Sequence, residues 1–202
     1  MKVAVIGATG MIGKPVTALL SDKGYEVVRA TRNTQPGVNL ADPASIDKFY
    51  KALGEVDAVI CVAGSAGYGP LAEMPDEQIQ LGINSKLLGQ VNLVRKGLSN
   101  VRPGGIFILT GGMMAYNPWP KTSNISMVNA GLEGFVRGAA LDLQDGRRVV
   151  IVHPPAVREW VVQMGMDGTP YPSAAKVAEA YLVALEGNVT GQPVFLEGYR
   201  PM

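Results

Sequence analysis

Residues 2–13 read KVAVIGATGMIG, an apolar run that leads directly into three glycines spaced three residues apart. Gly7 allows a sharp turn after the strand, Gly10 allows close approach of a pyrophosphate, and Gly13 allows tight packing of the following helix. The N-terminus of that helix then offers N–H donors to phosphates. The stretch predicts a nucleotide-binding turn that also includes Thr9, Met11 and Ile12, although a purely structural turn would favour glycine too.

Outward from this turn, apolar runs rich in β-branched residues alternate with segments of helical period. The expected strands are 2–7, 26–31, 37–40, 57–63, 105–111, 148–154 and 193–198, and the expected helices are 12–22, 43–53, 75–98, 124–144 and 173–186. Strands that are apolar on both faces and alternate with helices indicate a parallel sheet covered on both sides. We therefore predict an α/β, doubly wound Rossmann fold of about seven strands, forming one NAD(P)-binding domain over residues 1–202.

Composition narrows the classes of partner. The chain has 202 residues, 47% of them hydrophobic, which is enough for one sizeable core. Its 18 basic and 17 acidic side chains create no field of one sign, so nucleic acid and anionic membrane surfaces are not expected partners. We expect a cytoplasmic protein without a signal peptide, because the apolar start MKVAVIG is too short for one and no apolar run reaches about 18 residues.

Cysteine and histidine often act in catalysis, but the one residue of each type in this sequence is expected to have a structural role. The single cysteine, Cys61, lies in the apolar run DAVICVAG and is expected in the core rather than as a nucleophile. The single histidine, His153, precedes two prolines at a strand end, where a hydrogen-bonded structural role is the commoner one. No cluster of cysteine, histidine and acidic residues has metal-ligand spacing, so no metal is predicted.

The end of the second expected strand, VVRATRNT, bears on the choice of cofactor. A site that prefers NAD usually has an acidic residue here, against the ribose 2′-hydroxyl. This segment carries Thr31 and Arg32 at that place, and Arg32, past the strand end, can pair with a 2′-phosphate. NADP(H) is therefore predicted over NAD(H), with a solvated surface arginine as the alternative.

Taken together, these motifs resemble those of the short-chain dehydrogenase/reductase family over nearly the whole chain. The resemblance rests on the segments GATGMIG, VNLADPASI, DAVICVAGSAGYGPL, INSKLLGQVNLVRKGL, GIFILTGG, RRVVIVHPPAV and TGQPVFLEG, in this order. It implies that Ala63 and Gly64 approach the cofactor ribose, that Leu40 lies near the adenine and that Pro154 lies near the nicotinamide. Asn84 matches the family's proton-relay asparagine, or is simply a helix-kinking amide.

The chain departs from the family at the catalytic positions. By the resemblance, Ile125 stands at the tyrosine position and Asn129 at the lysine position, so the Y-x-x-x-K pair is missing. The serine position falls at Gly111 or Gly112, with Thr110 the nearest hydroxyl. A lysine beside a tyrosine lowers the pKa of the phenol and so aids proton exchange. Isoleucine cannot exchange a proton, and asparagine offers only hydrogen bonds.

Other polar residues near these positions are candidates to replace the missing pair. Ser126 can orient a substrate oxygen, although a serine near a helix start more commonly caps it. Tyr116 and Lys121 are five residues apart on a proline-containing loop and do not form an i,i+4 pair. The candidate catalytic residues are therefore Asn84, Ser126 and Asn129. The residues expected to line an apolar pocket, or simply to cover the sheet edge, are Tyr68, Met113, Met114, Tyr116 and Trp119.

Two functions fit these observations. The first is an NADP(H)-dependent oxidoreductase acting on a small or aromatic carbonyl or alcohol, with an atypical proton donor. The second is a cofactor-binding protein with little hydride chemistry, such as a redox sensor, regulator or auxiliary protein. The resemblance also implies a homodimer or homotetramer, because the helix after Asn124 carries the small residues that such an interface needs: Gly131, Gly134, Gly138, Ala139 and Ala140.

Overall fold

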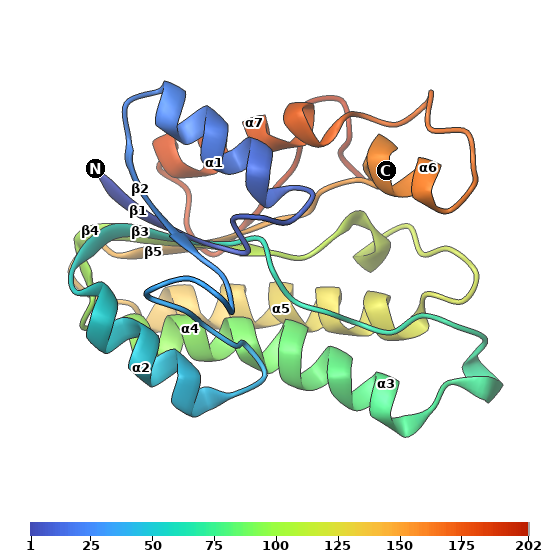
Figure 1. The fold of residues 1–202 in the computed structure, drawn as a ribbon, viewed down its shortest axis with the longest axis horizontal. Coiled ribbons are helices and arrows are strands. Elements are labelled where there is room, and N and C mark those ends of the chain that lie inside the picture. The colour runs from blue at the N-terminus through green and yellow to red at the C-terminus, as the bar shows by residue number, and fades with distance from the viewer. Residues whose placement is uncertain (202) are drawn as a thin grey trace.

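The structure, a computed structural model, describes residues 1–201 and is built around one parallel sheet. The strand order is β2-β1-β3-β4-β5-β6. Their bounds are β1 Lys2–Ile6, β2 Glu26–Ala30, β3 Val56–Cys61, β4 Val101–Thr110, β5 Arg148–Val152 and β6 Pro193–Val194. Helices lie on both faces of the sheet (Figure 1), so the predicted doubly wound Rossmann fold is confirmed.

Strand β1 explains why its sequence is apolar without alternation. Val3 and Val5 pack into the core cluster on one face of the sheet, and Ala4 and Ile6 pack into the cluster on the other. The strand is paired on both sides, with β2 and β3. A strand buried on both faces has no solvent side for polar residues, so the continuous run KVAVI follows from its central place.

The helices form two layers. The elements α1 (Gly13–Asp22) and α7 (Ala174–Glu186) cover one face, with the short α6 (Arg158–Gln163) on the same side. The other face carries α2 (Pro43–Leu53), α5 (Ser123–Asp142) and a long composite helix. That helix runs from α3 (Asp76–Leu81) through a π-helical segment, Gly82–Leu88, into α4 (Gly89–Gly97). No helix within residues 1–201 has the length and apolarity needed to cross a membrane.

Residues 37–40 and the last strand differ from the sequence prediction. Residues 37–40 form no strand, so the sheet has six strands in the described chain, one fewer than the seven expected. The Val38 N–H donates to Thr31 O at 2.9 Å, and Val38 and Leu40 are buried in the core. Their alternation therefore reflects core packing of a loop. The last strand is also shorter than predicted, because the chain turns at Leu196–Tyr199.

The order of the strands locates a crevice. From β1 the chain goes to β2 on one side, then returns to β3 on the other. Ligands in open α/β sheets bind at such a reversal, outside the carboxyl ends of the strands. Here the two strand ends touch closely, since a Cβ at Gly7 would lie 2.8 Å from the Cβ of Ala63. The glycine turn therefore opens into this crevice.

Candidate functional site

The glycine turn has the backbone geometry that its sequence predicts. Gly7 has a φ of +87°, a backbone conformation that residues with a side chain rarely adopt. The Gly10 N–H donates to Gly7 O at 2.9 Å and closes the turn. A Cβ at Gly13 would lie 1.9 Å from Gly7 O, so only glycine allows α1 to start this close to the strand. The turn thus leaves exposed backbone at the crevice, as a phosphate cradle requires.

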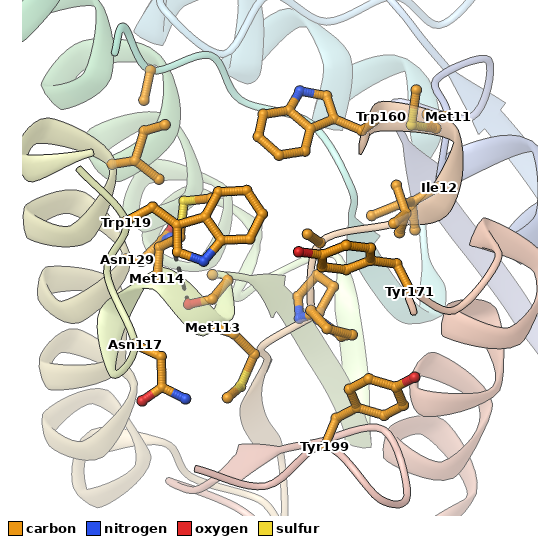
Figure 2. Close-up of a pocket in the computed structure, with 18 of the residues that line it drawn as sticks. Met11, Ile12, Met113, Met114, Asn117, Trp119, Asn129, Trp160, Tyr171 and Tyr199 are labelled. Atoms are coloured by element: carbon orange, nitrogen blue, oxygen red, sulfur yellow. Dashed lines mark hydrogen bonds between the residues drawn. The ribbon is translucent and has the colours of Figure 1, made fainter. Parts of the chain in front are cut away.

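A cavity of about 700 Å³ lies at the carboxyl ends of the strands, next to this turn. Figure 2 shows Trp119, Met114 and Asn129 on one side of it, with Ile12, Tyr171 and Trp160 across from them. Trp119 lies with its ring centroid 5.9 Å from that of Trp160 and 6.1 Å from that of Tyr171. The walls are therefore largely apolar and aromatic, which suits a flat organic ligand.

The charges at the cavity are all of one sign. Its lining within residues 1–201 contains Lys86 and Arg200 and no carboxylate. The expected pocket residues Met113, Met114 and Trp119 do line it. Tyr68 is instead 53% exposed, and Tyr116 faces a buried cluster behind the wall. An anionic or neutral ligand fits this lining better than a cation does.

Ile125 and Asn129 are one helical turn apart on α5 and both line the cavity. The Asn129 Nδ2 donates to Gly112 O at 3.5 Å, the interaction drawn in Figure 2. Its Oδ1 is buried and has no hydrogen-bond partner among the described residues. A buried carbonyl oxygen without a donor is costly, so a ligand hydroxyl that donates to it would relieve that cost.

The other two candidate catalytic residues lie elsewhere. Asn84 is exposed on the π-helical segment, and Ser126 has its hydroxyl 3.5 Å from that of Thr122 at the start of α5. Neither is among the described residues that line the cavity. Of the three candidates, the structure brings only Asn129 to the cavity.

Thr110, the hydroxyl nearest to the family's serine position, is already engaged. Its Oγ1 donates to Cys61 O at 2.5 Å and lies 2.8 Å from the Tyr181 hydroxyl. The side chain is buried on the far side of β4 from α5, among residues of the α7 layer. Cys61 is buried, as expected, and burial raises the pKa of its thiol to about 11. Neither group is placed to act on a ligand in the cavity.

A buried polar cluster supports the wall of the cavity. The Glu133 carboxylate accepts hydrogen bonds from Tyr116 and Arg137, and lies 3.1 Å from His153 Nε2 at an angle outside hydrogen-bond geometry. On its other side, His153 Nδ1 accepts from the Gly112 N–H at 3.1 Å. Burial lowers the pKa of His153. The cluster therefore anchors Gly112, the residue that also contacts Asn129, and gives His153 the structural role expected from sequence.

The predicted cofactor residues divide into two groups. Met11, Ile12, Gly64 and Pro154 line the cavity together. Arg32 is exposed past the end of β2, while the neighbouring Thr31 N–H donates to Thr34 Oγ1 at 2.8 Å. Leu40, expected near the adenine, is instead buried in the core against Gly89 and is outside the described lining of the cavity. The first group lines the cavity, whereas Arg32 lies outside its described lining.

Sequence reasoning missed Lys86, Trp160 and Tyr171. Lys86 belongs to the segment INSKLLG, in which the sequence predicted Asn84 as the site residue. The signal was a lone lysine among leucines and isoleucines on a helix that packs against the sheet. Trp160 and Tyr171 come from α6 and the loop after it, where the sequence predicted a loop but no helix. No spacing rule pointed to these two aromatic side chains.

Comparison with known proteins agrees with the geometry. Residues 37–182 match the model of the family described as Enoyl-(Acyl carrier protein) reductase. The chain is 25% identical to 3-oxoacyl-[acyl-carrier-protein] reductase of Rattus norvegicus, covering 96% of this chain and 95% of that protein.

Solved structures are similar over the full length. The crystal structure of the protein lin1944 from Listeria innocua is 33% identical with a TM-score of 0.90, covering 97% of this chain and 99% of that one. A small-chain dehydrogenase in complex with NADPH is 24% identical with a TM-score of 0.86, covering 98% and 97%. On the family match, the sheet order and the glycine turn, the chain belongs to the short-chain dehydrogenase/reductase family.

Proposed function

We propose that the protein is an NADP(H)-dependent oxidoreductase that interconverts a small or aromatic carbonyl compound and its alcohol. The observation that carries the proposal is the buried Asn129 Oδ1, an acceptor without a donor among residues 1–201, at a cavity beside the glycine turn. A ribose hydroxyl of a dinucleotide would satisfy it. The NADPH complex of a structurally similar dehydrogenase supports the same cofactor class.

The chain's own residues fit such a cofactor. The turn Gly7–Gly13 would hold the pyrophosphate with backbone N–H groups, and Arg32 would pair with the 2′-phosphate. Gly64 would allow close approach of the ribose, since it carries no side chain and has a φ of +127°. Pro154, which lines the cavity, would lie against the nicotinamide. The bound cofactor supplies or accepts the hydride.

The cavity lining supports the class of substrate. Trp119, Trp160 and Tyr171 can stack on a flat ring, and Met113 and Met114 can adapt to its shape. Because Ile125 and Asn129 cannot exchange protons, the proton must come from another group. The proposal therefore includes a donor that differs from the tyrosine–lysine pair.

The second candidate function is a cofactor-binding protein with little turnover. Ile125 on the cavity wall favours it, because an aliphatic side chain there removes proton transfer. The two functions share the cofactor and differ in chemistry.

The test is steady-state NADPH oxidation against a panel of aliphatic and aromatic ketones, aldehydes and quinones, beside calorimetric titration of the cofactor. Turnover above the uncatalysed rate with aromatic members supports the oxidoreductase. Tight NADPH binding without turnover across the panel would favour the second function. Absence of NADPH binding would contradict both.

Asn129 gives a sharper test of the site. Asn129→Ala removes the unpartnered oxygen, and we expect weaker NADPH binding by about 0.5–1.5 kcal/mol, the usual scale of one lost hydrogen bond. Asn117→Ala, at another polar position of the cavity lining, is the matched control and should bind NADPH within a few-fold of the parent protein.

A further inference from the structure

Lys86 is placed where the family's usual catalytic groups are missing. Its Nζ donates to Thr110 O at 3.0 Å, and its side chain lines the cavity. Asn129 Nδ2 contacts Gly112 O, two residues further along the same segment. The lysine thus reaches the Thr110–Gly112 turn from the π-helical segment, whereas Asn129 reaches it from α5.

The backbone around Lys86 is shaped to admit its side chain. A Cβ at Gly64 would lie 3.0 Å from Lys86 Cα and 3.2 Å from its Cβ and Cγ, so the carbon stem runs directly against this glycine. Gln90 holds the other side by donating to Lys86 O at 3.2 Å and to Thr110 O at 2.9 Å. The ammonium carries three donors. Thr110 O takes one, and the remaining N–H groups are available to a ligand in the cavity.

The surroundings of this ammonium contain no partner of opposite charge. The titratable groups that face it are the buried Cys61 thiol of β3 and the buried His153 imidazole after β5, with Glu133 of α5 beyond the imidazole. The acidic residues of α3, Asp76 and Glu77, are exposed. Burial outweighs the other influences and lowers the pKa of Lys86 to about 8. Such an amine can both hold and release a proton near neutral pH.

We infer that Lys86 is the proton donor of this site for carbonyl reduction, an inference that rests on the proposed function. As the substrate C=O π bond breaks, the hydride supplied by NADPH forms the new C–H bond and a proton from the Lys86 ammonium forms the O–H bond. The products are the alcohol, NADP⁺ and a neutral Lys86 amine, which regains a proton from water. In alcohol oxidation the neutral amine accepts the hydroxyl proton.

Other groups are less suited to this step. The Thr110 hydroxyl is engaged on the far side of its strand, and Ser126 lies near the start of α5. Two phenols, Tyr171 and Tyr199, line the same cavity and are competing donors. They stand on the loop after α6 and on the segment after β6, whereas Lys86 contacts the end of β4 directly through Thr110 O.

The experiment compares Lys86→Met, Lys86→Arg, Tyr171→Phe and Tyr199→Phe in NADPH-driven reduction of a ketone that the parent protein turns over. Methionine keeps the length of the stem without a charge, and arginine keeps the charge without a readily released proton. We expect both lysine variants to bind NADPH within a few-fold of the parent in calorimetry and to lose about 10²–10⁴-fold in kcat. The phenol variants should keep kcat within about tenfold.

The control Lys96→Met removes another lysine of the same composite helix, one that pairs with Asp47 at 2.7 Å on the surface. It should leave turnover unchanged. The parent rate of reduction should fall as pH rises through about 8, where the ammonium loses its proton, and this fall should vanish in Lys86→Met. A readout without turnover is acetic anhydride labelling of Lys86 across pH, followed by peptide mass spectrometry, with a midpoint expected near 8.

Several outcomes would overturn the inference while leaving the proposed function intact. These are full kcat in Lys86→Met, full kcat in Lys86→Arg, or loss of kcat in a phenol variant alone. A labelling midpoint near the ordinary lysine value of about 10.4 would also overturn it. A parent protein that binds NADPH and reduces no carbonyl in the panel would instead contradict the proposed function, and the donor role with it.

Discussion

His153 Nε2 lies 3.1 Å from the Glu133 carboxylate, and both side chains are buried behind the cavity wall. The carboxylate also accepts from Tyr116, just after the Met113–Ala115 turn, and from Arg137 of α5, so one acidic side chain contacts three separate segments, including the end of β5. Its removal would take from the Tyr116 hydroxyl and the Arg137 guanidinium the acceptor that they share. The cluster thereby links the stability of the fold to the position of Gly112.

Glu133→Ala is therefore expected to lower the free energy of unfolding by about 1–3 kcal/mol, the range for leaving a hydrogen-bonding group without its partner. Urea denaturation followed by circular dichroism measures it. Glu179→Ala, which breaks the exposed contact with Lys176 at 2.6 Å, is the control and should cost at most about 1 kcal/mol. A loss as small as that in Glu133→Ala would show that the cluster is not a structural anchor.

Stability should also depend on pH through His153, the single histidine of the sequence. Burial lowers its pKa in the folded protein, so the unfolded chain binds more protons below the ordinary histidine value of about 6.5. The histidine's contribution to stability is present above that pH and is lost as the pH falls below it. The melting temperature should decrease between about pH 6.5 and 5, and the decrease should be smaller in His153→Gln. If the melting temperature fell equally with pH in the parent protein and in His153→Gln, His153 would not be the cause of the pH dependence.

Cofactor preference should follow Arg32. We expect NADP(H) to bind more tightly than NAD(H), and Arg32→Ala to reduce that preference by about tenfold, because one charge-assisted contact to the 2′-phosphate is lost. Arg29→Ala, a neighbouring exposed arginine on β2, is the control. Calorimetric titration of both cofactors gives the ratio. Equal or tighter binding of NAD(H) by the parent protein would refute the assignment of Arg32.

Assembly should involve the exposed face of α5 and the composite helix. A Cβ at Gly134 or Gly138 would meet no atom within 4 Å, and Leu88 and Met127 nearby are 43% and 47% exposed. We expect a homodimer or homotetramer in light scattering at micromolar concentration. A Cβ at Gly134 lies in open space within the subunit, so dissociation of Gly134→Arg into monomers would place this face in the interface.

Val183→Arg is the matched control for that variant. Val183 is 61% exposed on α7, in the helix layer on the opposite side of the sheet, and its replacement should leave the oligomer intact. A monomeric mass for the parent protein at micromolar concentration would remove the idea of an oligomer. An intact oligomer in Gly134→Arg would move the interface elsewhere.

The sequence was sufficient for features that depend on backbone sterics. Gly7 and Gly13 have few alternatives at a strand-to-helix turn, and the apolar strands indicated a sheet buried on both faces. Residues 37–40 were wrongly predicted as a strand. Val38 and Leu40 are buried in the core, so this loop shows the same alternation of apolar and polar residues as a strand. The alternation shows which side chains are buried. It does not show whether the segment pairs with a neighbouring strand or only packs against the core.

Side-chain placement at the cavity was harder to predict. The resemblance predicted Asn84 as the match to the family's asparagine, yet this side chain is exposed in the structure. Lys86, two residues later, is the one that lines the cavity. A motif gives the identity and spacing of residues, whereas the direction of each side chain depends on the local helical geometry.

The π-helical segment Gly82–Leu88 changes the direction of side chains along the composite helix. A π-turn closes over one more residue than an α-turn. Relative to an uninterrupted α-helix, the α3 portion is therefore rotated out of phase with α4 by roughly one residue, or about 100°. A prediction that assumes about 3.6 residues per turn throughout this segment therefore assigns the wrong direction to the side chains that precede it. Deleting a single residue there would reset the phase, and so would change which side chains of α3 (Asp76–Leu81) face the rest of the domain.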